Sequence, residues 1–338
     1  MILVTGGTGL VGAHLLLHLS KNEDSICAIY RNENHIEKTK SLFTTLDSLI
    51  HFSKINWIKA DILDVPSLEN AFENIDFVYH CAAKISFDPD DEDALRKTNI
   101  EGTANIVNFC IAKKVKKLCH VSSIAALGEP FPDQKIINET NEWNPEKQHS
   151  DYAISKYGAE MEVWRAHQEG LAVVIVNPAV IFGIAATAID WKNGSGAFFI
   201  AIKKGFPFYT KGITGYVSVN DVVKIMMLLM KAPINGERFI LVSENRTYKD
   251  IIATISKKIG AKNPTLNAKP WILNIAWRID WIFTAIFRSK RKISKQSALA
   301  LQSKIKLSNE KIVSHLNYSF EPIDDCLDSI THFFLKSL

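Results

Sequence analysis

The feature that most constrains this chain is its opening, where a short apolar run leads directly into regularly spaced glycines. Residues 2–4 are apolar, and Gly6, Gly9 and Gly12 follow in a G-x-x-G-x-x-G pattern before an apolar helical repeat. This order predicts a buried strand, a tight turn and a helix whose positive amino end favours a pyrophosphate. The candidate dinucleotide contacts are Thr5, Gly6, Gly7, Thr8, Gly9, Leu10, Val11 and Gly12.

The three glycines are expected to serve different purposes. Gly6 suits a turn residue that needs positive φ, Gly9 leaves room for phosphates, and Gly12 lets the helix pack near the strand. Glycines also mark ordinary turns, but their position between a strand and a helix favours nucleotide binding.

Strand-like runs alternate with helical periodicity through the first half of the chain. We predict strands at 2–5, 25–30, 55–60, 77–82, 118–122 and 171–176, and helices at 34–50, from Pro66, at 91–112 and at 151–168. The alternation predicts an α/β fold with a doubly wound parallel sheet of the Rossmann type. Ligands of such sheets bind beyond the carboxyl ends of the strands.

The alternation ends after Pro178. Residues 184–216 are rich in glycine and aromatics, 216–221 lead into an apolar helix at 222–230, and 238–242 resemble one more strand. We therefore predict a dinucleotide-binding domain at 1–178 and 214–242. A smaller, interleaved α/β substrate lobe is expected at 179–213 and 243–338.

Composition excludes several classes of protein. The net charge of +4 over 338 residues gives no case for a nucleic-acid partner, and the five cysteines form no C-x-x-C pair. The first strand starts at residue 2, which leaves no room for a signal peptide. The apolar segment 271–287 is interrupted by Arg278 and Asp280 and is too short to span a bilayer. We expect a cytoplasmic protein with reduced thiols and no metal site.

A tyrosine and a lysine four residues apart carry the predicted chemistry. Tyr152 and Lys156 would lie on one face of a helix, where the ammonium lowers the pKa of the phenol toward neutrality. Such a phenol can exchange a proton with an alcohol or a carbonyl. Ser123 follows the fifth predicted strand and can hydrogen-bond the same substrate oxygen.

At this point the chain resembles the extended short-chain dehydrogenase/reductases, also called the NAD-dependent epimerase/dehydratase family. The matching segments are 5–12, Asp61-Ile62, 80–83, 99–103, 121–123, 152–156, 177–183 and 216–221. They occur in family order over about two thirds of the chain.

The resemblance implies a role for each matching residue. Ser123, Tyr152 and Lys156 would be the catalytic set, with Lys156 also holding the nicotinamide ribose. Asn99 matches a structural and proton-relay asparagine, although a plain polar residue inside a helix is an equal alternative. The further cofactor contacts implied are Asp61 and Ile62 at the adenine, Ala82, Ala83, Lys84 and Val121 at the middle, and Pro178 and Val180 at the nicotinamide end.

The end of the second strand favours NADP over NAD. An acidic residue there would accept from a ribose 2′-hydroxyl, but the sequence reads Tyr30-Arg31-Asn32. The Arg31 guanidinium suits a 2′-phosphate, although a solvated loop arginine is the alternative and NAD stays open.

The reaction is expected to be hydride transfer between nicotinamide and a small carbonyl or secondary alcohol. Sugar dehydratases of the family carry an acidic pair where this chain has Ile124-Ala125. Lys203, Lys204 and Lys211 could clamp a nucleotide sugar in an epimerase with retained NAD, but a solvated face is the better interpretation.

Aromatic residues in the second half favour an apolar substrate. They are Phe198, Phe199, Phe206, Phe208, Tyr209, Trp271, Trp277 and Trp281. Part of this set must be core, since a stripe at helical spacing is more often core than pocket. The pattern is nearest to the dihydroflavonol-reductase and 3β-hydroxysteroid-dehydrogenase branch.

Three further possibilities stay open. A non-catalytic NADP sensor is the competing class, although the Ser–Tyr–Lys set argues against it. The basic run 288–292 could rest on an anionic membrane, but a solvated helix end is the stronger interpretation. A homodimer is common in the family, and nothing in the sequence demonstrates one.

Overall fold

A seven-stranded parallel sheet forms the centre of the computed structural model, which describes residues 1–86, 88–131, 134–185, 191, 194–287 and 294–337. The strand order is β11-β7-β5-β4-β1-β2-β3. The strands are β1 (Ile2–Thr5), β2 (Ile26–Tyr30), β3 (Ile55–Lys59), β4 (Phe77–His80), β5 (Lys117–Val121), β7 (Val173–Pro178) and β11 (Glu237–Leu241). This confirms the predicted doubly wound sheet.

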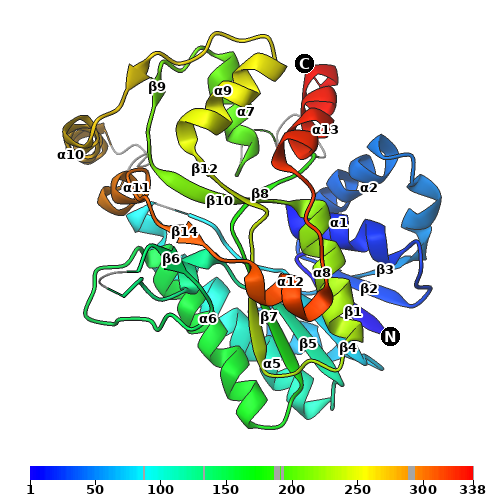
Figure 1. Cartoon of the computed structure of the whole chain (residues 1–338). Helices are drawn as coiled ribbons and strands as arrows, with labels where there is room; N and C mark the ends of the chain where they lie inside the picture. The colour runs from blue at the N-terminus through cyan, green and yellow to red at the C-terminus, as the bar shows by residue number, and fades with distance from the viewer. Residues whose placement is uncertain (87, 132–133, 186–190, 192–193, 288–293, 338) are drawn as a thin grey trace.

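Helices cover both faces of the large sheet (Figure 1). One face packs against α1 (Leu10–Leu19), α2 (Ile36–Thr45) and α8 (Val219–Lys231), and the other against α3 (Val65–Ala71), α5 (Gly102–Ala112) and α6 (Asp151–Gln168). The inner strands are buried on both sides and are therefore apolar without alternation. Val173–Val176 of β7, for example, are fully buried.

A smaller part of the molecule lies beyond the carboxyl ends of the large sheet (Figure 1). Its three-stranded sheet has the order β12 (Glu244–Thr247), β10 (Ile213–Ser218), β8 (Val180–Phe182). Two small sheets pair β9 (Phe208–Tyr209) with β13 (Leu266–Asn267), and β6 (Ile136–Ile137) with β14 (Lys306–Leu307). The late helices are α7 (Gly196–Lys203), α9 (Tyr248–Lys258), α10 (Pro270–Phe287), α11 (Lys295–Ala300), α12 (Glu310–Leu316) and α13 (Ile323–Lys336).

The two parts are interleaved along the chain. β11 joins the large sheet and α8 covers it, whereas β10 pairs with β8 and β12 in the smaller sheet. The division into 1–178 with 214–242 and 179–213 with 243–338 stays a proposal, and in the structure the strand β10 lies with the smaller part.

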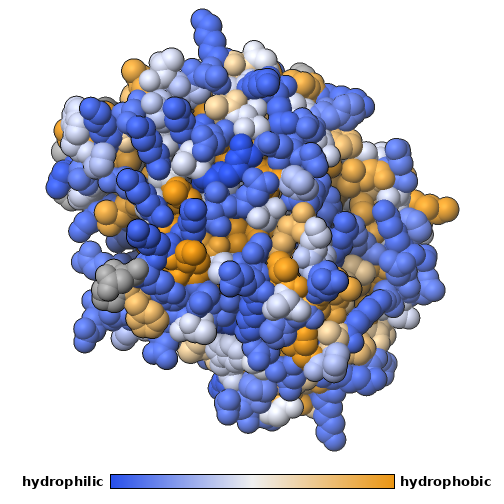
Figure 2. Space-filling model, viewed as in Figure 1, coloured by the Kyte–Doolittle hydropathy of each residue, from blue (hydrophilic) through white to orange (hydrophobic). Residues whose placement is uncertain are grey.

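The hydropathy of the surface differs between the middle and the rim of the molecule in this view. On the face that Figure 2 shows, hydrophilic residues dominate the periphery, and hydrophobic residues gather in patches across the middle. Among the described helices, none combines the length and the apolar character needed to cross a membrane.

Several element bounds differ from the sequence predictions. The helix expected over 91–112 is split into α4 (Glu92–Leu95), a π-helical turn at Arg96–Glu101, and α5. The helix expected at 222–230 begins at Val219, because Ser218 caps it by accepting a hydrogen bond from Asn220 N (3.2 Å). The helix expected over 34–50 ends at Thr45.

Candidate active site

The glycine loop joins β1 to α1 and has the geometry expected from its sequence. Gly6 has φ +68°, and a Cβ built on it would lie 2.6 Å from Ala82 N. A Cβ on Gly12 would lie 2.2 Å from the carbonyl oxygen of Gly6. On Gly9 the nearest atom would be 3.4 Å away, so the space beside this residue is open. A side chain is therefore excluded at Gly6 and Gly12 by backbone atoms.

The amino end of α1 is suited to an anion. Its N-cap residue is Gly9, which supplies no side-chain cap, and the first-turn N–H groups of a helix have no acceptor within the helix. The loop also lies between β1 and β4, where the strand order reverses and dinucleotides bind in open α/β sheets. The residues present therefore fit a dinucleotide pyrophosphate.

The predicted adenosine contacts lie at the ends of β2 and β3. Arg31 is exposed, and its Nη1 atom is 3.9 Å from Asp61 Oδ2. Ile62 differs, because its side chain is buried against Gly102 of α5 and its carbonyl oxygen accepts from Asn105 Nδ2 (2.9 Å). Of the three predicted contacts, Arg31 and the partly exposed Asp61 are thus available at this edge, whereas the Ile62 side chain is not.

Asn99 lies in the π-helical turn and holds the loop that follows β4. Its Oδ1 accepts from Lys84 N (2.7 Å), and its Nδ2 donates to Lys84 O (3.0 Å) and Ser155 Oγ (2.9 Å). The Ser155 hydroxyl donates in turn to Tyr152 O (2.8 Å). Asn99 therefore connects the Ala82–Lys84 loop to the first turn of α6.

The residues predicted to be catalytic lie together at the carboxyl end of β5. Tyr152 and Lys156 are one turn apart on α6, and the Tyr152 hydroxyl is hydrogen-bonded to Ser123. The Lys156 ammonium is buried and donates to Val121 O (2.8 Å). Ser123 is held by Asn177, whose Nδ2 donates to its carbonyl oxygen (3.0 Å).

Burial controls the ionisation of this pair. Desolvation raises the pKa of Tyr152, and the hydrogen bond from Ser123 opposes that rise. Burial also lowers the pKa of Lys156 from 10.5 to about 8, while the charge of Glu160 opposes this fall. The drop in the pKa of Tyr152 that the sequence led us to expect is therefore not seen, because desolvation of the phenol dominates.

A fully buried carboxylate lies one turn beyond Lys156 on the same helix. Glu160 Oε2 accepts from Ser122 Oγ (2.7 Å) and Asn177 Nδ2 (2.9 Å), and Oε1 pairs with Arg238 Nη1 (3.0 Å). A buried charge needs such partners to offset its lost hydration. Glu160 thereby brings α6, β5, β7 and β11 together behind the catalytic turn.

A second buried network fixes the end of β1. Thr103 Oγ1 donates to Asn99 O, so the Nε2 atom of His80 must donate to Thr103 Oγ1 (2.9 Å). His80 Nδ1 then accepts from Thr5 Oγ1 (2.7 Å), which itself accepts from Ala82 N (3.1 Å). Burial lowers the pKa of His80 to about 3, so this histidine is neutral.

Pro178 and Val180 flank the carboxyl end of β7. Pro178 ends this buried strand and Val180 begins β8. Ala179 lies between them, and its N–H donates to Leu241 O (3.0 Å).

The aromatic residues of the second half divide between core and surface. Phe199 is buried in a cluster with Trp191, Phe182, Tyr216 and Phe334. Trp271 and Phe206 are exposed, and the Trp281 side chain and the run 288–292 lie outside what the structure describes. Phe199, a candidate pocket residue by sequence, is therefore structural core and supplies no surface for an apolar substrate. Lys203, Lys204 and Lys211 are all exposed, as expected for a solvated face.

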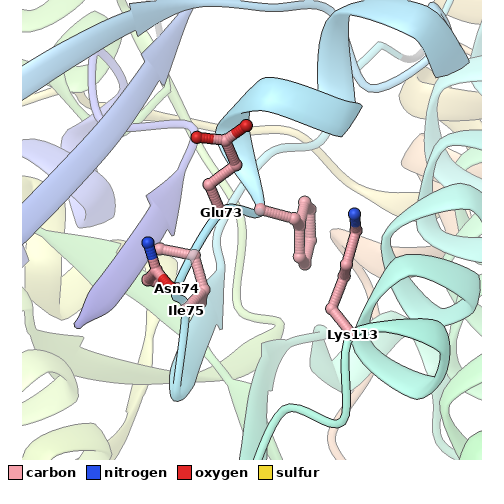
Figure 3. Close-up of a pocket in the computed structure, with 5 residues that line it drawn as sticks. Glu73, Asn74, Ile75 and Lys113 are labelled. Carbon is pink, nitrogen blue, oxygen red and sulfur yellow. The ribbon is translucent and has the colours of Figure 1, made fainter.

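An open pocket of about 390 Å³ lies elsewhere (Figure 3). Its lining residues Phe72, Glu73, Asn74 and Ile75 precede β4, and Lys113 follows α5. It therefore lies at the amino edge of the sheet, opposite to the glycine loop.

Sequence reasoning missed the contribution of Glu160, Ser155 and Arg238. The sequence did contain a signal for Glu160, because its spacing of four from Lys156 and eight from Tyr152 places all three residues on one helical face. Ser155 is buried behind that face, and Arg238 lies 78 residues from its partner, a separation that no local pattern reveals.

Comparison with known proteins gives the family. Residues 2–242 match the description "NAD dependent epimerase/dehydratase family". The chain belongs to the NAD-dependent epimerase/dehydratase family. Its relatives include sterol demethylase protein B of Methylococcus capsulatus, which is 28% identical over 80% of this chain and 78% of that protein. Dihydroflavonol 4-reductase of Callistephus chinensis is 25% identical over 76% of this chain and 72% of that protein.

Comparison with solved structures shows the same fold. The crystal structure of gox2253 superposes with a TM-score of 0.81 at 24% identity, and the match covers 99% of this chain and 98% of that one. The predicted family resemblance, Rossmann-type fold and NAD(P) dependence are thereby confirmed.

Proposed function

We propose that the protein is an NADP(H)-dependent reductase that interconverts a small apolar ketone or aldehyde and the corresponding alcohol. The observation that carries this proposal is the grouping of Ser123, Tyr152 and Lys156 at the sheet edge that holds the glycine loop. The similarity to a sterol demethylase protein and to dihydroflavonol reductases supports an apolar substrate.

The roles of the residues follow from their positions. When bound, the nicotinamide supplies or accepts a hydride at the substrate carbon. Ser123 donates a hydrogen bond to the substrate oxygen, and Tyr152 gives that oxygen its proton during reduction. The positive charge of Lys156 stabilises the phenolate that remains on Tyr152. Asn99 holds the first turn of α6 against the Lys84 loop, so that these groups keep their places.

Turnover with a panel of carbonyl compounds tests the proposal. Purified protein should oxidise NADPH when offered apolar ketones, among them a sterol ketone and a dihydroflavonol, and Ser123→Ala should reduce kcat by about 10²-fold. Nucleotide sugars should not be turned over. Release of stoichiometric NAD on denaturation would instead identify an epimerase, and NADPH binding without turnover of any compound would identify a sensor.

Cofactor choice depends on Arg31 in this proposal. Arg31→Ala should raise KM for NADPH by about 10- to 100-fold, since a charge-assisted bond to phosphate contributes about 1.5–3 kcal/mol. KM for NADH should change little. The control is Lys54→Ala, which removes another surface cation, directly before β3. It should change the KM for neither NADPH nor NADH. An equal effect of Arg31→Ala on both cofactors would refute the role of Arg31.

A further inference from the structure

The described side chains of helix α10, those of residues 270–280, include one buried apolar side and one exposed apolar side. It lies at the rim of the molecule, seen nearly end-on in Figure 1. Leu273 and Trp277 face inward, where they join a small core with Ala298 and Leu301 of the α11 region. These inward residues attach the helix to the smaller part of the protein.

The other side of α10 carries an exposed apolar stripe in its described part. Trp271, Ile275 and Ile279 are four residues apart and therefore share one face of the helix. Their exposed fractions are 60%, 46% and 51%. Three large apolar side chains in succession on a helix face are unusual for a surface in contact with water alone.

The sequence of this helix and its flanking residues is rich in positive charge. Residues 262–295 contain eight lysines and arginines and a single acidic residue, Asp280, whereas the whole chain has a net charge of only +4. The rest of the protein is therefore slightly acidic. Arg278 belongs to this basic set, and its guanidinium lies 4.9 Å from the Trp277 ring centre.

We propose that the α10 face formed by Trp271, Ile275 and Ile279 docks onto the surface of an anionic phospholipid bilayer. Tryptophan and isoleucine on one side of a helix, with flanking lysines and arginines, are the features of a helix that lies in the headgroup region. A second copy of this chain is disfavoured as the occupant, because pairing these faces would bring two strongly basic segments together. None of these α10 residues belongs to the proposed catalytic set, so the proposal does not depend on the proposed reaction.

Vesicle binding by the full-length protein tests this proposal. The wild type should co-sediment with vesicles of phosphatidylcholine containing about 30% phosphatidylglycerol and bind pure phosphatidylcholine at least about tenfold more weakly. The double variant Ile275→Ser/Ile279→Ser should lose about tenfold or more in affinity for the anionic vesicles, because two apolar contacts are removed. Ile50→Ser/Val65→Ser removes two exposed apolar side chains elsewhere (81% and 50% exposed) and should bind as the wild type does.

Three results would overturn the proposal. Equal binding of the wild type and the α10 variant to anionic vesicles would show that the protein adsorbs through its charge alone, without contact by the apolar residues of α10. Absence of vesicle binding by the wild type would exclude the bilayer, and a wild-type dimer that becomes a monomer in the α10 variant would assign the face to a second copy. Thermal melting and NADPH affinity of the variants report folding separately, so failure here leaves the proposed reductase activity untouched.

Discussion

Lys156 is buried, yet its positive charge is what would stabilise a Tyr152 phenolate. Two groups of α6, Tyr152 and Glu160, face the ammonium. Three more face it from the sheet: His80 at the end of β4, Cys81 directly after it, and His120 in β5. Burial lowers the pKa of both histidines and raises that of the Cys81 thiol, so these three groups are neutral near pH 7. Glu160 is therefore the group that favours the charged form of Lys156.

This balance predicts the pH dependence of catalysis. Lys156 is protonated below its pKa of about 8, so kcat/KM should decline above about pH 8. In Glu160→Gln the favourable charge is lost, the pKa of Lys156 falls further, and the alkaline limb should move to lower pH by about one unit. A pH–rate profile from pH 6 to 10 measures the shift.

The control for this variant lies on the same helix. Glu162→Gln breaks only the partly exposed pair with Arg165 and should leave the limb in place. Glu160→Gln should also lose about 3–5 kcal/mol of stability, because Arg238 is left without its buried carboxylate. A folded Glu160→Gln protein with an unchanged alkaline limb would show that Glu160 is structural only.

Elements with strong local patterns were predictable, and those set by distant contacts were not. The glycine loop and the helix at 151–168 follow the sequence closely, because glycine spacing, the Ser150 cap and helical periodicity are local. The π-helical turn at Arg96–Glu101 was missed, since Asn99 is placed there by bonds to Lys84 and Ser155. The pairing of β10 with β12 likewise depends on residues some thirty positions apart.

The loop before α1 provides a prediction at this scale. Gly12→Ala would place a methyl group against the Gly6 carbonyl, so the amino end of α1 must move away from the loop. NADPH affinity should fall by about tenfold or more in isothermal titration, since the donors of the helix end no longer converge. Gly260→Ala is the control: its φ of +67° makes alanine cost about 1 kcal/mol, but affinity should be retained. Equal affinities of the two variants would contradict the role given to the loop.

The whole molecule buries neutral histidines, and this makes its stability depend on pH. Burial lowers the pKa of His14 from 6.5 to about 4 and that of His80 to about 3. Below pH 6.5 the unfolded chain binds protons that the folded chain does not, so the free energy of unfolding decreases as the pH falls. The shift of His14 alone corresponds to roughly 3 kcal/mol by pH 4.

Thermal melts from pH 7 to pH 4.5 measure this loss. His14→Gln keeps a donor for the Ile184 carbonyl oxygen and should flatten the decrease, whereas exposed His35→Gln should not. A wild-type melting temperature that is constant over this range would be inconsistent with neutral buried histidines.

At the scale of the whole chain, the sequence was sufficient for the fold class and the family but not for the contents of the smaller part. Parallel strands and the ordered motifs are visible as local patterns, and they suffice to indicate a Rossmann-type sheet. Aromatic residues such as Phe199 and Trp271 look alike in sequence. Only their packing shows that one is core and the other is exposed on α10.

The most direct measurement of the central claim is NADPH binding and turnover in Tyr152→Phe. Removing the hydroxyl takes away the proton donor but leaves the glycine loop and Lys156 in place. NADPH affinity should stay within about threefold of the wild type while kcat falls by about 10³-fold. Turnover equal to that of the wild type, or a folded wild type that binds neither NADPH nor NADH, would contradict this account.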